Sequence, residues 1–201
     1  TTSVTAMHLA EIFQEAGLPS GVVNIVTGAG ATGAALVEHP DVDKIAFTGS
    51  TEVGKQIAAT TAGSGKKLTL ELGGKAANIV FDDAPIEQAV EGVIKGSYFN
   101  QAHVCCAVSW LLLQESIHDE FVERLERRLK TLRVGDPLDK NTDVGAINSK
   151  EQLKRITGVI GSGIEEGAEI HTSGAELPDE GCWCAPTFFT GVSSSHRIAR
   201  E

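Results

Sequence analysis

Apolar residues recur at helical and strand periods along the first part of the chain. Apolar positions three and four residues apart predict an amphipathic helix over residues 3–16, which ends before Gly17 and Pro19. A β-branched run then predicts a buried strand at residues 22–26. Beyond a glycine-rich loop the pattern predicts, in order, a helix over 31–38, a strand over 44–47, a helix over 51–62 and a strand over 67–72.

A second α/β segment follows. Strands are predicted at 76–81 and 108–113, and apolar stripes predict helices around 86–94, 117–132 and 153–164. Ser116 is expected to open the helix over 117–132, with Asp119 as a capping-box-like partner. The last thirty residues read as irregular. Strands that alternate with helices at this spacing indicate an α/β fold with parallel strands covered by helices.

Composition and charge narrow the class of protein. The chain has 201 residues, is 41% hydrophobic and 22% charged, and carries a formal net charge of −10, which is typical of a globular protein and disfavours nucleic acid or an anionic membrane as partner. No apolar run reaches the roughly 18 residues of a membrane-spanning helix. The first residues show neither an initiator Met nor a signal-peptide pattern, so we expect an internal segment of a longer protein.

The first glycine-rich motif runs from Gly28 to Gly33 and has the form G-x-G-x-x-G directly after a predicted strand. A dinucleotide-binding fingerprint also requires an acidic residue about 20 positions further on, at the end of the next strand. Asp41 and Asp43 come before that strand. The motif therefore leaves two interpretations open, a tight turn or a phosphate contact.

A second motif leads from a strand into a helix. Phe47 ends the strand, and Gly49 and Ser50 stand just before the predicted helix. The free N–H groups at a helix N-terminus attract phosphate, and a glycine lets a ligand approach the backbone. Simple capping of the helix by Ser50 or Thr51 explains the same residues equally well.

Glu71 stands between two leucines at the end of a predicted strand and is followed by Gly73 and Gly74. Apolar surroundings disfavour the ionised carboxylate and raise its pKa toward the range of a general base. The alternative is a surface ion pair with Lys75.

The four cysteines form two close pairs, Cys105 with Cys106 and Cys182 with Cys184. These spacings suit neither a disulfide framework nor a zinc site with paired C-x-x-C arms, so no metal site is predicted and a reducing compartment is favoured. Cys105 lies in a loop between a helix and a strand, where a thiolate nucleophile is possible, although most free cysteines are small buried hydrophobes. His103 is a weak candidate partner for it.

Four of these segments occur together in an order and spacing that resemble the aldehyde dehydrogenase superfamily over the whole chain. They are residues 15–24 (EAGLPSGVVN), 47–50 (FTGS), 71–75 (ELGGK) and Asn100-Gln101-x-x-x-Cys105. The resemblance implies a partial Rossmann-like parallel sheet in residues 1–72, the later half of a nucleotide-binding domain. It implies a truncated thiol-bearing catalytic domain in residues 73–201.

The resemblance also implies roles for single residues. Cys105 would be the nucleophile and Glu71 the general base. The remaining positions would bind the cofactor: Gly49 and Ser50 at the pyrophosphate, the loop from Gly28 to Gly33 near the adenosine, Leu72 and Gly73 near the nicotinamide, and Phe47 beside them. No metal ligands are implied.

The implied reaction oxidises a small-molecule aldehyde to a carboxylic acid with NAD, and NADP is left open. The Cys105 thiolate adds to the aldehyde, the thiohemiacetal gives a hydride to nicotinamide, and water activated by Glu71 hydrolyses the thioester. The intact protein is expected to be a cytoplasmic homo-oligomer, with the mitochondrial matrix as the other compartment considered.

The nucleophile loop departs from the family pattern. Ala102 and His103 stand where the family has Gly-Gln, and Val108 and Trp110 stand where it has Gly and Arg. Alanine replaces glycine freely only at a negative φ. Parts of the family's cofactor site also lie outside the chain. A non-catalytic relative with a structural or regulatory role is therefore the main alternative, and a simple nucleotide-binding module is a weaker one.

Overall fold

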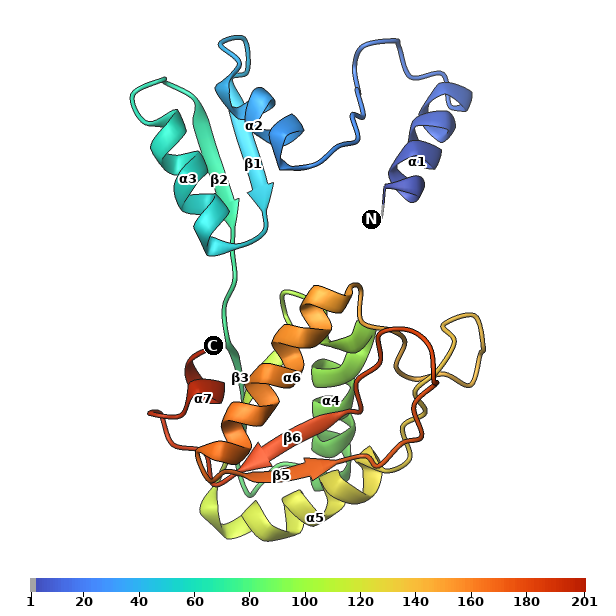
Figure 1. Cartoon of the computed structure of the whole chain (residues 1–201), viewed down its shortest axis with the longest axis vertical. Coiled ribbons are helices and arrows are strands. Elements are labelled where there is room, and N and C mark those ends of the chain that lie inside the picture. The colour runs from blue at the N-terminus through green and yellow to red at the C-terminus, as the bar shows by residue number, and fades with distance from the viewer. Residues whose placement is uncertain (1–2) are drawn as a thin grey trace. The chain divides into compact units, whose positions relative to one another are not determined.

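The structure is a computed structural model that describes residues 3–201 (Figure 1). Contacts between Cα atoms divide the chain into two units, Thr1–Gly73 (unit 1) and Gly74–Glu201 (unit 2). Both units mix helices and strands, which confirms the α/β class. Within residues 3–201, no helix has the length and apolar character needed to cross a bilayer.

Unit 1 is built around one pair of parallel strands. Its described elements are α1 (Val4–Glu15), α2 (Gly30–Glu38), β1 (Lys44–Thr48), α3 (Thr51–Thr61) and β2 (Lys67–Glu71). β1 and β2 pair in parallel, with Lys44 opposite Lys67 and Thr48 opposite Glu71. The strands therefore end together at one edge, which carries the motifs of interest.

The predicted strand at residues 22–26 is wrong. These residues adopt no regular structure, and Val22, Val23 and Val26 are 62%, 47% and 66% exposed. An extended segment becomes a strand only when a neighbour satisfies its backbone hydrogen bonds. No such neighbour pairs with this run among residues 3–201. The helix before it, α1, formed as predicted but has no buried residue.

Unit 2 contains two further strand pairs. Its described elements are β3 (Ala76–Val80), α4 (Ile86–Tyr98), the 3₁₀ turn η1 (Phe99–Ala102), β4 (Val108–Leu113), the 3₁₀ turn η2 (Glu115–Ile117), α5 (His118–Leu129), α6 (Lys150–Glu165), β5 (Glu169–Thr172), β6 (Thr187–Thr190) and α7 (Arg197–Arg200). β3 and β4 are parallel, whereas β5 and β6 are antiparallel. In Figure 1, β5 and β6 run between α5 and α6.

The core of unit 2 lies where α4 and α5 meet the β3–β4 pair. Phe121, Leu125 and Leu129 recur every four residues along α5 and are at most 1% exposed. They form one cluster with Val90 and Ile94 of α4. Helical spacing of apolar residues placed this stripe correctly, because a helix of this period turns one continuous face toward its neighbours.

Two predictions about unit 2 are wrong. The last thirty residues are not irregular throughout, since they contain β6 and α7. β6 is only four residues long and half-buried on both faces, so it lacks the alternation that marks a strand. Ser116 also does not cap α5; its hydroxyl donates to Asp82, and Ile117 occupies the cap position without a side-chain hydrogen bond.

Candidate active site

The ends of β1 and β2 bring two of the predicted motifs together. Phe47 lies in β1, Gly49 follows this strand, and Glu71 is the last residue of β2. The Gly49 N–H donates to the Glu71 carbonyl oxygen at 3.0 Å. The glycine loop and the strand that bears the predicted base are therefore tied to each other by the backbone.

The loop after β1 opens directly into α3. The Ser50 hydroxyl accepts a hydrogen bond from the Val53 N–H at 3.3 Å, so the capping interpretation of Ser50 is confirmed. The N–H groups of Thr51 and Glu52 belong to the first turn, where a helix offers no backbone acceptor. A Cβ atom at Gly49 would lie 2.4 Å from the ring of Phe47. A side chain at residue 49 would therefore force the loop or the Phe47 ring to move.

Leu72 and Gly73 continue from β2 over the first turns of α3. A Cβ atom at Gly54 of α3 would lie 2.5 Å from a methyl group of Leu72, and one at Gly73 would lie 3.8 Å from the Thr51 hydroxyl. A side chain at residue 54 would therefore force the Leu72 side chain to move. Together with Phe47, Gly49 and Ser50, the edge gathers most of the residues predicted to bind cofactor.

A cavity of about 820 Å³ lies between α2, β1 and α3 in unit 1. Gly33 and Phe47 both line it, together with Val53 of α3. Gly28 has a different role, since a Cβ atom there would lie 2.1 Å from the Thr32 hydroxyl. Gly28 thus lies close against Thr32, whereas Gly33 faces a space that a ligand could fill, and a phosphate contact of this loop stays a prediction.

The carboxylate of Glu71 is exposed in unit 1. The flanking Leu70 and Leu72 are half-buried and do not enclose it. The apolar surroundings expected from the sequence are thus not supplied by these two neighbours. The ammonium group of Lys75, the alternative partner, donates to the carbonyl of Ile198 within unit 2 at 3.3 Å. Burial lowers the pKa of Lys75, and the nearby Glu201 raises it.

The predicted nucleophile lies at the tip of a turn in unit 2. The Ala107 N–H donates to the Val104 carbonyl at 2.9 Å, and Cys105 and Cys106 are the two central residues of this turn. Both thiols are free and exposed. No hydrogen bond joins a His103 ring nitrogen to Cys105 among residues 3–201, and the His103 Nε2 is buried there without a hydrogen-bond partner. Cys105 and Glu71 belong to different units, and their convergence stays a prediction.

The backbone before this turn is strained. Asn100, Gln101 and Ala102 have φ angles of 50°, 55° and 61°, the left-handed region that favours glycine. Ala102 therefore stands at a position where the glycine of the family pattern would fit without strain. Val108 begins the extended strand β4 and escapes this problem. Nothing in the residue pattern revealed three consecutive left-handed residues.

The second cysteine pair, Cys182 and Cys184, lies in the loop before β6. The Cys184 thiol lies 3.6 Å from the Ala185 carbonyl, and burial raises its pKa. Among residues 3–201, no group of three His, Cys, Asp or Glu side chains could hold a metal ion.

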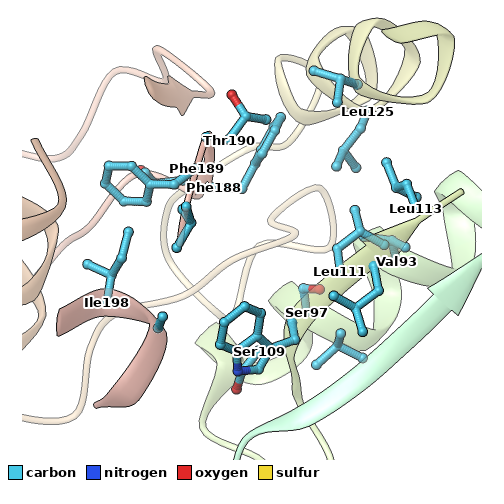
Figure 2. A pocket seen from close by; sticks show the side chains of 18 of the residues that line it. Val93, Ser97, Ser109, Leu111, Leu113, Leu125, Phe188, Phe189, Thr190 and Ile198 are labelled. Carbon is cyan, nitrogen blue, oxygen red and sulfur yellow. The ribbon is translucent and has the colours of Figure 1, made fainter. Parts of the chain in front are cut away.

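Unit 2 has a cavity of its own, of about 580 Å³, between β4 and β6. Figure 2 shows Leu111 and Leu113 of β4 on one side and Phe188 of β6 on the other. Ala102 lines the cavity, but neither Cys105 nor Cys106 does. This apolar space is therefore separate from the exposed thiols.

Comparisons with known proteins agree on one family. The profile of the Aldehyde dehydrogenase family matches residues 1–201. The chain is 46% identical over 202 residues to "Aldehyde dehydrogenase, cytosolic 1" of Mus musculus, with 100% of this chain and 40% of that protein covered. It is also 46% identical over 202 residues to "Aldehyde dehydrogenase, mitochondrial" of Homo sapiens, covering 100% of this chain and 39% of that protein.

Solved structures give the same result. The crystal structure of an NAD-dependent aldehyde dehydrogenase from Sinorhizobium meliloti superimposes with a TM-score of 0.95 at 42% sequence identity, covering 100% of this chain and 40% of that one. The chain thus spans about 40% of the length of the relatives it matches. Sequence and fold agree, and the chain belongs to the aldehyde dehydrogenase family.

Proposed function

We propose that this chain supplies the thiol, the general base and part of the dinucleotide site of an NAD-dependent enzyme that oxidises an aldehyde to a carboxylic acid. The observation that carries the proposal is the hydrogen bond from the Gly49 N–H to the Glu71 carbonyl. It holds a phosphate-type loop against the strand that presents a carboxylate. NADP remains the alternative cofactor.

The residues of unit 1 fit a dinucleotide. The first turn of α3 offers N–H groups to an anion, and Gly49 keeps the approach free of a side chain. The cavity lined by Gly33, Phe47 and Val53 has room for the adenosine part. Leu72 and Gly73 directly follow β2, and we assign them to the nicotinamide part of the cofactor. When bound, the cofactor supplies a hydride acceptor.

Cys105 acts first in the proposed reaction. Its thiolate adds to the aldehyde carbon and forms a C–S bond, so that the carbonyl oxygen becomes the oxygen of a thiohemiacetal. Loss of a hydride from this tetrahedral carbon leaves a thioester on Cys105. Glu71 then accepts a proton from water, the hydroxide adds to the thioester, and the C–S bond breaks to release the acid and the thiolate.

The proposal extends to the compartment, the subunit assembly and the substrate of the protein. Relatives include cytosolic and mitochondrial proteins. We place this protein in the cytoplasm, with the mitochondrial matrix as the alternative, and propose that it acts as a homo-oligomer on a small aldehyde.

Burst kinetics in the protein that carries this chain test the two assignments separately. Cys105→Ser should lower reduced-nicotinamide formation on the order of 10⁴-fold, because the nucleophile is lost. Glu71→Gln should keep a burst of one reduced nicotinamide per site and lose steady turnover, because only hydrolysis is blocked. Cys106→Ser is the matched control and should behave like the wild type.

Two outcomes would contradict the proposal. Turnover that survives Cys105→Ser would remove Cys105 as nucleophile, and a burst lost in Glu71→Gln would give Glu71 a role before hydrolysis.

The positive φ of Ala102 favours the second candidate function, a non-catalytic relative. That candidate predicts no burst in the wild-type protein while dinucleotide binding persists.

A further inference from the structure

The side chain of Gln101 joins the nucleophile loop to a distant part of unit 2. In the amide orientation that satisfies both of its ends, the Gln101 oxygen accepts from the Gly145 N–H at 2.8 Å. The Gln101 nitrogen donates to the Asn100 carbonyl at 3.1 Å and to the Asn100 side-chain oxygen at 3.2 Å. One amide group thus bridges two backbone segments and satisfies its own donors and acceptor.

The segment that receives Gln101 is itself well anchored. Val144, Gly145 and Ile147 are buried. Val144 forms a β-bridge with Val134, and the Ile147 N–H donates to the Cys182 carbonyl at 2.7 Å. A Cβ atom at Gly145 would lie 2.9 Å from the end of the Gln101 side chain. The anchor therefore fits Gln101 closely and leaves no space for a side chain at 145.

The bridged loop needs such an anchor. Asn100, Gln101 and Ala102 all adopt left-handed backbone conformations, which are unfavourable for residues with a Cβ atom and persist only when surrounding contacts impose them. The His103 N–H closes this turn onto the Asn100 carbonyl at 2.9 Å. The turn that carries Cys105 begins at the next residue, Val104. The conformation of residues 100–102 therefore fixes where the Cys105 turn starts.

We propose that Gln101 is a positioning residue that holds the nucleophile loop in its left-handed conformation by clamping it to Gly145. The clamp fixes the direction in which Cys105 leaves the loop. This inference rests on the proposed role of Cys105, but the clamp itself can be measured without any turnover.

Amide hydrogen exchange on the full chain measures the clamp directly. Gln101→Met keeps the length of the side chain and removes its hydrogen bonds, so exchange at His103 and Ala107 should accelerate roughly five- to tenfold. Exchange in α5 should stay unchanged. Gln88→Met, an exposed glutamine on α4 of the same unit, is the matched control and should leave both regions as they are.

A second variant approaches the clamp from its other side. Gly145→Ala should expel the Gln101 amide and reproduce the acceleration at His103 and Ala107. Combined with Gln101→Met it should add little, since both changes break the same contact. Ala102→Gly should reduce the effect of Gln101→Met, because glycine holds the left-handed turn without help.

Activity then tests the catalytic consequence. Gln101→Met should lower the burst rate roughly tenfold with KM little changed, because it misplaces the thiol and leaves the dinucleotide site intact. Unchanged exchange at His103 and Ala107 would overturn the clamp, and so would equal acceleration in α5, which indicates a general loss of structure. A wild type without a burst, but with the expected exchange pattern, would overturn the proposed function and leave the clamp standing.

Discussion

The two units of the molecule differ in the size of their apolar cores. Unit 1 buries only Ile45 and Ile57 among its large apolar side chains in the described residues, and α1 buries none. Unit 2 has a cluster of nine buried apolar residues between α4, α5 and the β3–β4 pair. The edge that we propose to bind cofactor (residues 47–50 and 71–73, the cofactor edge) thus belongs to the unit with fewer buried apolar residues, and the thiol loop belongs to the unit with more.

This difference shows how each site is held. Backbone geometry holds the cofactor edge: parallel strand ends, the bond from Gly49 to Glu71, and glycines that permit close packing. The thiol loop is held against its own backbone preference, because residues 100–102 are strained. Unit 2 can sustain that strain since its core supplies stability independently of the loop.

The largest expected effect breaks the core of unit 2. Phe121→Ala should lower the free energy of unfolding of unit 2 by about 3–5 kcal/mol, because Phe121 is 0% exposed and its removal leaves a cavity. Chemical denaturation, monitored by hydrogen exchange in α4 and α5, measures this loss of unfolding free energy. Leu138→Ala, at a residue 90% exposed, is the control and should change little. A loss below about 1 kcal/mol in Phe121→Ala would contradict the assigned core.

The next effect concerns the cofactor edge of unit 1. Gly49→Ala places a Cβ atom 2.4 Å from the Phe47 ring, so the loop or the ring must move at a cost of about 1–3 kcal/mol. NAD affinity, measured by calorimetry, should fall roughly tenfold or more. Gly92→Ala in α4 of unit 2, where a Cβ atom also meets nothing within 4 Å, is the control and should leave NAD affinity unchanged. Unchanged affinity in Gly49→Ala would remove this loop from the site.

The same contrast explains what the sequence could predict. Periodicity located α4 and α5, because each turns a continuous apolar face to its neighbours, and it placed Glu71 at the end of β2. It failed at residues 22–26, since a β-branched run is a strand only beside a partner strand. It also missed β6, which is short and evenly half-buried.

The site residues divide in the same way. The helix cap at Ser50 was predictable because a strand end followed by a helix cap is a local pattern. The contact of Gln101 was not predictable, because its partner Gly145 lies 44 positions further along the chain and no local signal links the two residues. The left-handed turn was visible in part, because Ala102 replaces a glycine of the family pattern and Asn tolerates a positive φ, but no signal indicated three such residues in a row.

A smaller effect tests the strain in the thiol loop. Ala102→Gly removes the Cβ atom from a residue with φ of 61° and should stabilise unit 2 by about 1 kcal/mol, the cost of a left-handed alanine less the extra entropy of glycine when unfolded. Thermal denaturation measures it. Ala107→Gly, in the same loop but absent from the residues of positive φ, is the control and should not stabilise. A destabilised Ala102→Gly variant would show that the loop relaxes in solution.

The smallest effect concerns His171, a buried histidine of β5. His171 is 8% exposed and stacks on Phe188 with ring centroids 4.5 Å apart. Its Nδ1 lies 2.7 Å from a carboxylate oxygen of Glu126 on α5, and its Nε2 lies 2.8 Å from the Thr190 hydroxyl. The hydrogen bond from His171 lowers the pKa of Glu126 below its usual 4.5, and Lys130 adds to this.

The sign of the pH dependence follows from that direction. A carboxyl group whose pKa is lower in the folded state than in the unfolded state stabilises the fold above the unfolded value, and this stabilisation is lost as the pH falls through the folded value. Glu126→Gln should therefore destabilise unit 2 above about pH 4.5, by less than about 1 kcal/mol because Glu126 is partly exposed. The difference from the wild type should shrink below that pH. Urea denaturation at a series of pH values measures it, with Glu123→Gln on the exposed face of α5 as control. A difference that grows on acidification would mean that the contact between Glu126 and His171 does not depend on an ionised carboxylate, and the sign of the pH dependence derived from it would be wrong.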